Sequence, residues 1–289
     1  MAKKMDTANE GLDLYVHAIR TFADTPWLHY GLWEPGERVV LPNLRRAQER
    51  YVDKLLGLIP PPPRRLLEVG GGTGEMSRLL ADKGHAVEMI TPSAIQCKIA
   101  RERLGGEAVV HQSKFEDFAG IGPFDVVLFS ESFQYVPLDK GLPKVKALLA
   151  PGGVLVISDV FRNEAFSGGL QPGGGHRFSE FVNEATALGF AFAADEDVTL
   201  SAAQTMAIDQ QLYRNVLSPA VDQLSGDLRR RRPFVHWLAS GAYRLFISKA
   251  EREKMKQRFR ALTTTAGTRQ FVLALPVADL AAWRRRKFW

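Results

Sequence analysis

The stretch Arg65-Leu-Leu-Glu-Val-Gly-Gly-Gly-Thr-Gly74 decides the fold of this chain. Its first half, Arg65 to Val69, is a short apolar run typical of a buried strand, and the residues from Glu75 to Lys83 predict a helix. The glycines between them permit a tight turn and let a ligand approach the backbone closely. A dinucleotide fingerprint requires glycine where this chain has Glu75, so the pattern is instead acidic-x-Gly-x-Gly-x-Gly.

Strands and helices alternate along the chain on both sides of this turn. Further strands are predicted at 86–90, 108–111, 124–129, 154–158, 190–199 and 268–275, and further helices at 93–104, 138–149 and 178–188. Such alternation predicts a parallel sheet, and the continuous apolar runs at 126–129 and 154–157 suit strands buried on both faces. We therefore predict an α/β, Rossmann-like, doubly wound sheet of seven strands whose last strand is antiparallel.

Two helical pieces are predicted outside the sheet. Residues 1–62 form an N-terminal helical cap segment, with helices at 12–22 and 41–58, and residues 201–265 form a helical lid insertion. The core spans residues 63–200, and residues 266–289 supply the last strand and a basic tail. The cap and the insertion together would close over the ligand site.

The composition excludes several classes of protein. Hydrophobic residues make up 45% and charged residues 24% of the 289 residues, which is ordinary for a globular domain and excludes a fibrous or disordered chain. The single cysteine excludes a disulfide framework. No apolar run is long enough to cross a membrane, and no apolar segment follows the charged start, so a cytoplasmic location is predicted.

Positive charge is concentrated in the last third of the chain. Residues 201–289 contain 17 Lys or Arg and 6 Asp or Glu, whereas the other residues are acidic on balance. The tail Trp283–Trp289 interleaves aromatic residues with cations, a pattern that suits a membrane interface. This region is interpreted as a peripheral membrane contact or a contact with a substrate phosphate, or else as a solvated helix face. Nucleic acid is not favoured as a partner because no motif of a DNA- or RNA-binding module is present.

The glycine turn and its surroundings resemble the class I S-adenosylmethionine-dependent methyltransferases, over about Arg65 to Ser158. In that family the turn wraps the methionine part of the cofactor, the acidic residue supports its amino group, the loop after the third strand flanks its adenine, and the fourth strand ends at the reaction site. The resemblance therefore implies that the cofactor contacts include Glu68, Gly70, Gly71, Gly72, Gly74, Lys114, Phe115 and Ser130.

The end of the second strand departs from the usual family pattern. Most members have an acidic residue there for the ribose hydroxyls, whereas this chain has Thr91-Pro-Ser93 with Gln96 one helical turn later. This pattern resembles the sterol C-methyltransferases and the cyclopropane-fatty-acid synthases. A threonine hydroxyl and a glutamine amide can make the same hydrogen bonds without charge, so Thr91, Ser93 and Gln96 are predicted cofactor contacts. Ser93 is equally explained as a helix N-cap.

Candidate catalytic residues lie in three places. Glu131-Ser132 with Tyr135 resembles the Glu-Ser/Ala-x-x-His stretch of sterol and tocopherol methyltransferases, with tyrosine in place of histidine. His29-Tyr30-Gly31 resembles a His-Tyr/His-Gly segment of the same enzymes. His176 follows three glycines and is a candidate base on a loop. The predicted catalytic set is Glu131, Tyr135, His29 and His176, and the predicted substrate pocket contains Tyr30, Trp33 and Gln134.

Each of these residues has a structural alternative. Glu131 stabilises a developing cation or removes a proton, or else it holds its loop in place. His29, Tyr30, Trp33 and Tyr135 form a pocket for a cation, or else a packed aromatic cluster under the lid. The histidines lack metal-ligand spacing, so no metal is expected.

The resemblance implies transfer of the methyl group of S-adenosylmethionine to a small acceptor. The sterol-like motifs favour a lipophilic or isoprenoid-like acceptor and methylation at carbon. An N- or O-methyltransferase of a polar small molecule in specialised metabolism is the first alternative. An RNA methyltransferase and a non-catalytic binding module are further alternatives.

Overall fold

The computed structural model describes residues 24–162, 175–205, 207–208, 223, 226 and 229–231, and it gives residues 268–276 as a backbone strand. The predicted helix at 12–22, most of the lid insertion and the basic tail lie outside the described residues. The division into cap, core, insertion and tail remains a prediction for those parts of the chain.

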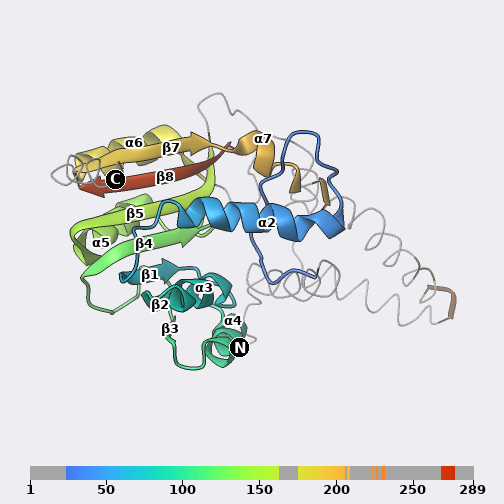
Figure 1. The fold of residues 1–289 in the computed structure, drawn as a ribbon, viewed down its shortest axis with the longest axis horizontal. Helices are drawn as coiled ribbons and strands as arrows, with labels where there is room; N and C mark the ends of the chain where they lie inside the picture. The colour runs from blue at the N-terminus through green and yellow to red at the C-terminus, as the bar shows by residue number, and fades with distance from the viewer. Residues whose placement is uncertain are drawn as a thin grey trace.

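A single mixed sheet forms the centre of the described part (Figure 1). Its strands follow the order β3-β2-β1-β4-β5-β8-β7, and the two-residue β6 pairs with β5 off this path. β8 is antiparallel to both of its neighbours, whereas the β1 to β5 pairs are parallel. The bounds are β1 Arg65–Val69, β2 Ala86–Thr91, β3 Ala108–Gln112, β4 Phe124–Ser130, β5 Leu149–Arg162, β6 His176–Arg177, β7 Phe190–Asp197 and β8 Thr268–Pro276. The predicted doubly wound sheet with an antiparallel last strand is confirmed.

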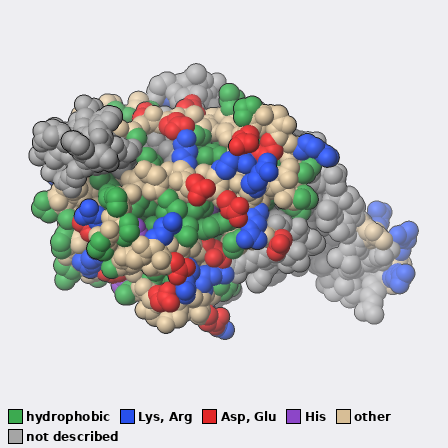
Figure 2. All heavy atoms as spheres, viewed as in Figure 1, with side chains coloured by type: hydrophobic (Ala, Val, Ile, Leu, Met, Phe, Trp, Pro, Cys, Tyr) green, Lys and Arg blue, Asp and Glu red, His purple; other side chains and the backbone are tan. Residues whose placement is uncertain are grey.

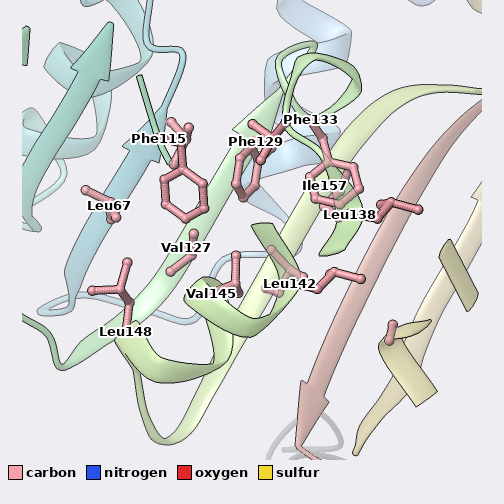
Figure 3. Packing of buried hydrophobic residues seen from close by; sticks show 14 of the residues in the cluster. Leu67, Phe115, Val127, Phe129, Phe133, Leu138, Leu142, Val145, Leu148 and Ile157 are labelled. Carbon is pink, nitrogen blue, oxygen red and sulfur yellow. The ribbon is translucent and has the colours of Figure 1, made fainter. Parts of the chain in front are cut away.

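Helices cover both faces of this sheet. Leu66, Val126 and Leu128 lie in one buried cluster with residues of α2 and α3, and the alternating side chains Leu67, Val127 and Phe129 lie in another with residues of α5 and α6 (Figure 3). Both faces of β4 are therefore buried in apolar packing, as its continuous hydrophobic run predicts. The helices are α2 Leu41–Leu56, α3 Glu75–Asp82, α4 Ala94–Leu104, the 3-10 helix η1 Phe133–Tyr135, α5 Leu138–Leu148, α6 Phe178–Ala187 and α7 Thr199–Ala202.

Three strand boundaries differ from the sequence prediction by more than one residue. β5 begins at Leu149 instead of 154, because Leu149 pairs with Phe124 and the intervening residues are accommodated by a shift of register. β5 also continues to Arg162, since β8 pairs with it as far as Phe161. β7 ends at Asp197, whose side chain accepts a hydrogen bond from the Thr199 amide (2.8 Å) at the start of α7.

Gly74 is the point where the turn after β1 becomes α3. Its φ is +82°, and a Cβ atom there would lie 3.2 Å from Ala100 Cβ and 3.3 Å from Leu104 Cδ1 of α4. A side chain at this position would therefore bring both backbone strain and crowding between the two helices.

Gly74→Ala is expected to lower the free energy of unfolding by about 2–4 kcal/mol, the sum of left-handed strain and overpacking. Gly36→Ala is the matched control, because Gly36 has a φ of +79° with nothing within 4 Å of its Cβ position. The control is expected to lose about 1–2 kcal/mol, from strain alone. Urea unfolding monitored by circular dichroism measures both variants, and equal losses would contradict crowding at the α3–α4 contact.

Candidate active site

The glycine turn lies at the edge of the sheet where the parallel strands end, and several of its glycines have a left-handed backbone. Gly70 and Gly72 have φ values of +77° and +56°. The amides of Gly70 and Gly71 both donate to the carbonyl of Ile90 in β2, at 2.8 and 3.2 Å. The amide of Gly72 makes no backbone hydrogen bond with the described residues. Hydrogen bonds thus fix the start of the turn to β2, whereas the backbone amide of Gly72 is left to bind a ligand.

Glu68 supports this turn from beneath. Its side chain is buried, and its carboxylate accepts a hydrogen bond from the Ser77 hydroxyl of α3. A Cβ atom at Gly71 would lie 3.0 Å from the carboxylate, so the turn packs directly on it. Burial raises the pKa of Glu68 to about 7, although the bonds from Ser77 act in the opposite direction. Ser77 was not predicted; its only sequence signal is a hydroxyl on the apolar face of α3.

The polar residues after β2 bind one another. The Thr91 hydroxyl donates to Gln96 Oε1 at 2.9 Å, and both side chains are buried. Ser93 Oγ accepts the amide of Gln96 at 3.2 Å and caps α4, which is the structural alternative predicted for it. The hydrogen bond from Thr91 therefore fixes the orientation of the side-chain amide of Gln96. Whether this pair contacts a ribose remains a prediction.

The two candidates after β3 lie in different environments. Lys114 is exposed, whereas Phe115 is buried and packs edge-on against Phe129, with ring centroids 5.4 Å apart. Figure 3 shows these two rings side by side, Phe129 on β4. Phe115 thus belongs to the apolar core that joins the loop to β4, and its proposed contact with adenine stays a prediction.

Glu131 adopts a rare backbone conformation at the end of β4. Its φ is +56°, a left-handed value that costs a residue other than glycine about 1–3 kcal/mol and that is concentrated at functional sites. Its amide donates to the Ser158 carbonyl at 2.8 Å, and its Oε1 accepts the Tyr30 amide at 3.0 Å. The preceding Ser130 Oγ lies 2.9 Å from the Tyr51 hydroxyl of α2. The surrounding contacts therefore hold an otherwise unfavourable turn.

The segment from Thr25 to Trp33 reaches both turns. The His29 ring stacks on Tyr51, with centroids 4.2 Å apart, and its Nδ1 lies 2.9 Å from the Tyr30 carbonyl. Leu28 Cδ1 lies 3.6 Å from the Cβ position of Gly72. The structure thus brings His29 and Tyr30 to Glu131, and it brings Leu28 to the glycine turn.

Trp33 lies deeper in the same segment. It is 3% exposed, its Nε1 donates to Thr205 Oγ1 at 2.8 Å, and it packs with Leu44 and Ala47 of α2. Among the described residues, Trp33 is thus packed with aliphatic side chains and not in an aromatic cluster, and its place in a substrate pocket stays a prediction. Thr205, which also accepts the amide of Gly31 at 3.0 Å, was not predicted.

Helix η1 follows Glu131 and carries two further candidates. The backbone amide of Gln134 donates to the buried carboxylate of Asp159 at 2.9 Å. The side-chain oxygen Oε1 of Gln134 is buried without a hydrogen-bond partner among the described residues. Tyr135 is 67% exposed. Asp159 was missed by the sequence analysis because the predicted strand ended at Ser158.

His176 lies against η1 from the other side. Its Nε2 is 3.2 Å from the Phe133 carbonyl, and its ring meets the Phe133 ring edge-on at 5.4 Å. Burial lowers the pKa of His176, so the imidazole is neutral at pH 7 and donates from Nε2 to the carbonyl. The structure therefore places this histidine at the edge of the site, held by main chain.

The described residues include no group of three or more His, Cys, Asp or Glu side chains that would hold a metal ion. Within the same residues, no helix is long and apolar enough to cross a membrane. Figure 2 shows acidic and basic side chains intermixed on the face that carries α2. Arg229 to Arg231 are exposed, and the rest of the basic C-terminal third lies almost entirely outside the described residues, so membrane contact stays a prediction.

Comparisons with known proteins agree with this geometry. Residues 43–192 match the methyltransferase domain family, and the chain belongs to that family. An uncharacterized methyltransferase of Geobacillus kaustophilus is 33% identical over 136 residues, which are 45% of this chain and 58% of that protein. The chain thus spans about three fifths of the length of this curated relative.

Solved structures share the fold at low identity. The cyclopropane synthase MmaA2 of Mycobacterium tuberculosis superposes with a TM-score of 0.65 at 18% identity, over 95% of this chain and 100% of that chain. The [4+2]-cyclase SpnF superposes with a TM-score of 0.64 at 20% identity, over 92% of this chain and 94% of that chain. The family match confirms the predicted class. The names of these two solved proteins refer to different reactions on one fold.

The raised pKa of Glu68 gives stability a definite pH dependence. The unfolded chain releases this proton near pH 4.5 and the folded chain near pH 7, so the contribution of Glu68 to stability falls as pH rises between these values. Glu68→Gln has no carboxyl group to titrate and does not lose stability in this way. The unfolding free energy of the variant minus that of the wild type is therefore expected to increase by ~3 kcal/mol from pH 4.5 to pH 7. Urea unfolding across that range measures it, and parallel pH profiles would contradict the assignment.

Proposed function

We propose that this protein is an S-adenosylmethionine-dependent methyltransferase that acts on a small, lipophilic or isoprenoid-like acceptor, with methylation at carbon favoured. The observation that carries the proposal is the junction of two turns at one sheet edge. The glycine turn after β1 contacts the turn after β4 that carries the left-handed Glu131, since a Cβ at Gly70 would lie 2.4 Å from Cβ of the adjacent Ser132.

The residues present fit the proposed cofactor. The half-exposed backbone at Gly72 offers an amide, and the carboxyl group of Glu68 beneath it offers a hydrogen-bond acceptor for an amino group. The oriented Thr91–Gln96 pair stands at the end of β2, the neighbour of β1. When bound there, the cofactor would supply a methyl group on a positively charged sulfur, which is already a good leaving group.

The protein's own part in such a reaction is to bring the reactants together, to align them and to exclude water. Leu28 packs toward Gly72 and places an apolar side chain over the glycine turn. Glu131, fixed by the Tyr30 amide, supplies a carboxylate that stabilises positive charge developing on an acceptor, or that takes up a proton after transfer. A carboxylate at this position is most useful for an electron-rich carbon that becomes cationic.

The alternative acceptor is a polar molecule methylated at nitrogen or oxygen. The neutral His176 beside η1 is the observation in its favour, because a hydroxyl acceptor requires a base and a neutral imidazole is one. The fold alone does not decide between these acceptors, nor between transfer and a reaction such as cyclisation.

Binding of S-adenosylhomocysteine, measured by isothermal titration calorimetry, tests the cofactor site. Gly72→Ala is expected to weaken binding at least tenfold, because it puts a side chain on the exposed part of the turn. Gly105→Ala is the matched control, since Gly105 has a nearly equal φ, +54° against +56°, with nothing within 4 Å of its Cβ position. Absence of binding to the wild type would favour a non-catalytic module, and equal losses in both variants would move the site elsewhere.

Transfer from S-adenosylmethionine with a deuterated methyl group tests the acceptor class. Organic and aqueous extracts of the source cells are incubated separately with the protein, and labelled products are identified by mass spectrometry. Label in the organic extract is expected; label only in the aqueous extract would establish the polar alternative. Glu131→Gln is expected to lower carbon methylation at least a hundredfold, about 3 kcal/mol of transition-state stabilisation. Methylation of a neutral amine would survive this change.

A further inference from the structure

Gln48 is a polar residue in the apolar stripe of α2. The buried residues of this helix are Leu44, Ala47, Gln48, Tyr51, Val52 and Leu55. Gln48 is 1% exposed, and a buried amide is costly unless its hydrogen bonds are satisfied. Its presence in this stripe therefore requires partners, and all of the partners found lie in the segment Thr25 to His29.

The Gln48 side chain holds that segment at three points. Its Oε1 accepts the Thr25 hydroxyl at 2.6 Å, and its Nε2 donates to the carbonyls of Trp27 at 3.2 Å and His29 at 2.6 Å. The donors of a glutamine amide are thereby both used, and its oxygen is engaged. This contact set fixes the amide in one orientation, because the reversed amide would place an oxygen against two carbonyl oxygens.

One peptide group joins Gln48 to Glu131. The His29 carbonyl, bound by Gln48, and the Tyr30 amide, bound by Glu131 Oε1 at 3.0 Å, are the two ends of the same planar peptide unit. In a trans peptide these ends point in opposite directions, so the unit spans the distance between α2 and the end of β4. Hydrogen bonds in such a chain polarise one another. The position of the Glu131 carboxylate is thus coupled to the side-chain amide of Gln48 on α2.

Further contacts between α2 and the segment around Tyr30 hold the His29–Tyr30 peptide in this position. The Leu32 amide donates to the Ala47 carbonyl at 2.8 Å, which anchors the segment on α2 just after Tyr30. Gly31 lies so close to α2 that a Cβ there would be 2.6 Å from Ala47 Cβ. The His29 ring stacks on Tyr51, one turn after Gln48. The segment is therefore seated on α2 on both sides of the bridging peptide.

We infer that Gln48 is a positioning residue for Glu131, acting through the His29–Tyr30 peptide. This inference rests on the proposed function only in giving Glu131 a catalytic role; the coupling itself is a property of the fold. Among the described residues, the Gln48 side chain makes its hydrogen bonds to the segment Thr25 to His29, so it acts through that segment and not in the reaction itself. Its contribution is to hold the amide that orients the carboxylate.

A double-mutant cycle tests the coupling in the full-length protein. Gln48→Met keeps the shape of the side chain and removes its hydrogen bonds; it is expected to lower the rate of deuterated-methyl transfer ten- to a hundredfold in the extract that accepts label. In a Glu131→Ala background the same change is expected to lower the rate less than twofold, because the residue that it positions is absent. Equal factors in both backgrounds would overturn the inference.

Two control variants keep the cycle interpretable. Glu49→Gln changes the adjacent, exposed residue of α2 and is expected to leave the rate unchanged. Thr25→Val removes the two bonds of the Thr25 hydroxyl, to Gln48 Oε1 and from the Trp27 backbone amide, and leaves the bond to the His29 carbonyl, so it is expected to cause a smaller loss than Gln48→Met. Should Gln48→Met not fold, Thr25→Val in the two Glu131 backgrounds supplies the same cycle.

Hydrogen exchange separates failure of this inference from failure of the proposed function. The Tyr30 amide is expected to exchange at least tenfold faster in Gln48→Met and in Glu131→Ala than in the wild type, whether or not the protein transfers a methyl group. Amides of β2 serve as the internal reference for global stability. Unchanged exchange at Tyr30 in both variants would overturn the coupling even if methyl transfer is found, and faster exchange without transfer would leave the coupling and overturn only the catalytic role of Glu131.

Discussion

The close approach of Gly70 to Ser132 is the contact on which the site depends. Parallel pairing of β1 with β4 brings the carboxyl ends of both strands to one edge, but the two turns meet there only because Gly70 has no side chain. The Ser132 hydroxyl donates back to the Val69 carbonyl and closes the junction. A larger residue at position 70 would separate the glycine turn from Glu131. The distance between the glycine turn and Glu131 is thus set by the absence of a side chain at Gly70.

The fold could be predicted from the sequence because its signals are local and repeated. The runs at 126–129 and 154–157 are apolar at every position, as strands covered on both faces must be, and the glycines at 70–74 require a turn at a defined place. The ends of β5 and β7 were predicted wrongly because pairing with neighbouring strands determines where these strands begin and end. Leu149 is in the strand because Phe124 lies opposite, and no property of the residues around Pro151 indicates that.

The candidate site was predictable only in part, for a related reason. Motif resemblance selected Glu68, Glu131 and His29, which the structure places at or beside the two turns. It gave no information on Ser77, Asp159 or Gln48, because each acts through a partner distant in sequence. Gln48 did leave a signal, an amide in an otherwise apolar helical stripe. Reading that signal requires knowing which segment covers the stripe, and this depends on tertiary packing.

The left-handed backbone at Glu131 shows why such distant partners are needed. A strain of about 1–3 kcal/mol persists only if neighbouring contacts offset it, and a net hydrogen bond contributes about 1 kcal/mol. The Ser158 carbonyl accepts the Glu131 amide, and the Tyr30 amide donates to the Glu131 carboxylate. Contacts from both β5 and the segment Thr25 to Trp33 therefore offset the backbone strain. Gln48 engages the other end of the same peptide and so helps to hold the Tyr30 amide in that position. A carboxylate held in this way is oriented before any acceptor arrives, which is the form of preorganisation that electrostatic stabilisation of a developing cation requires.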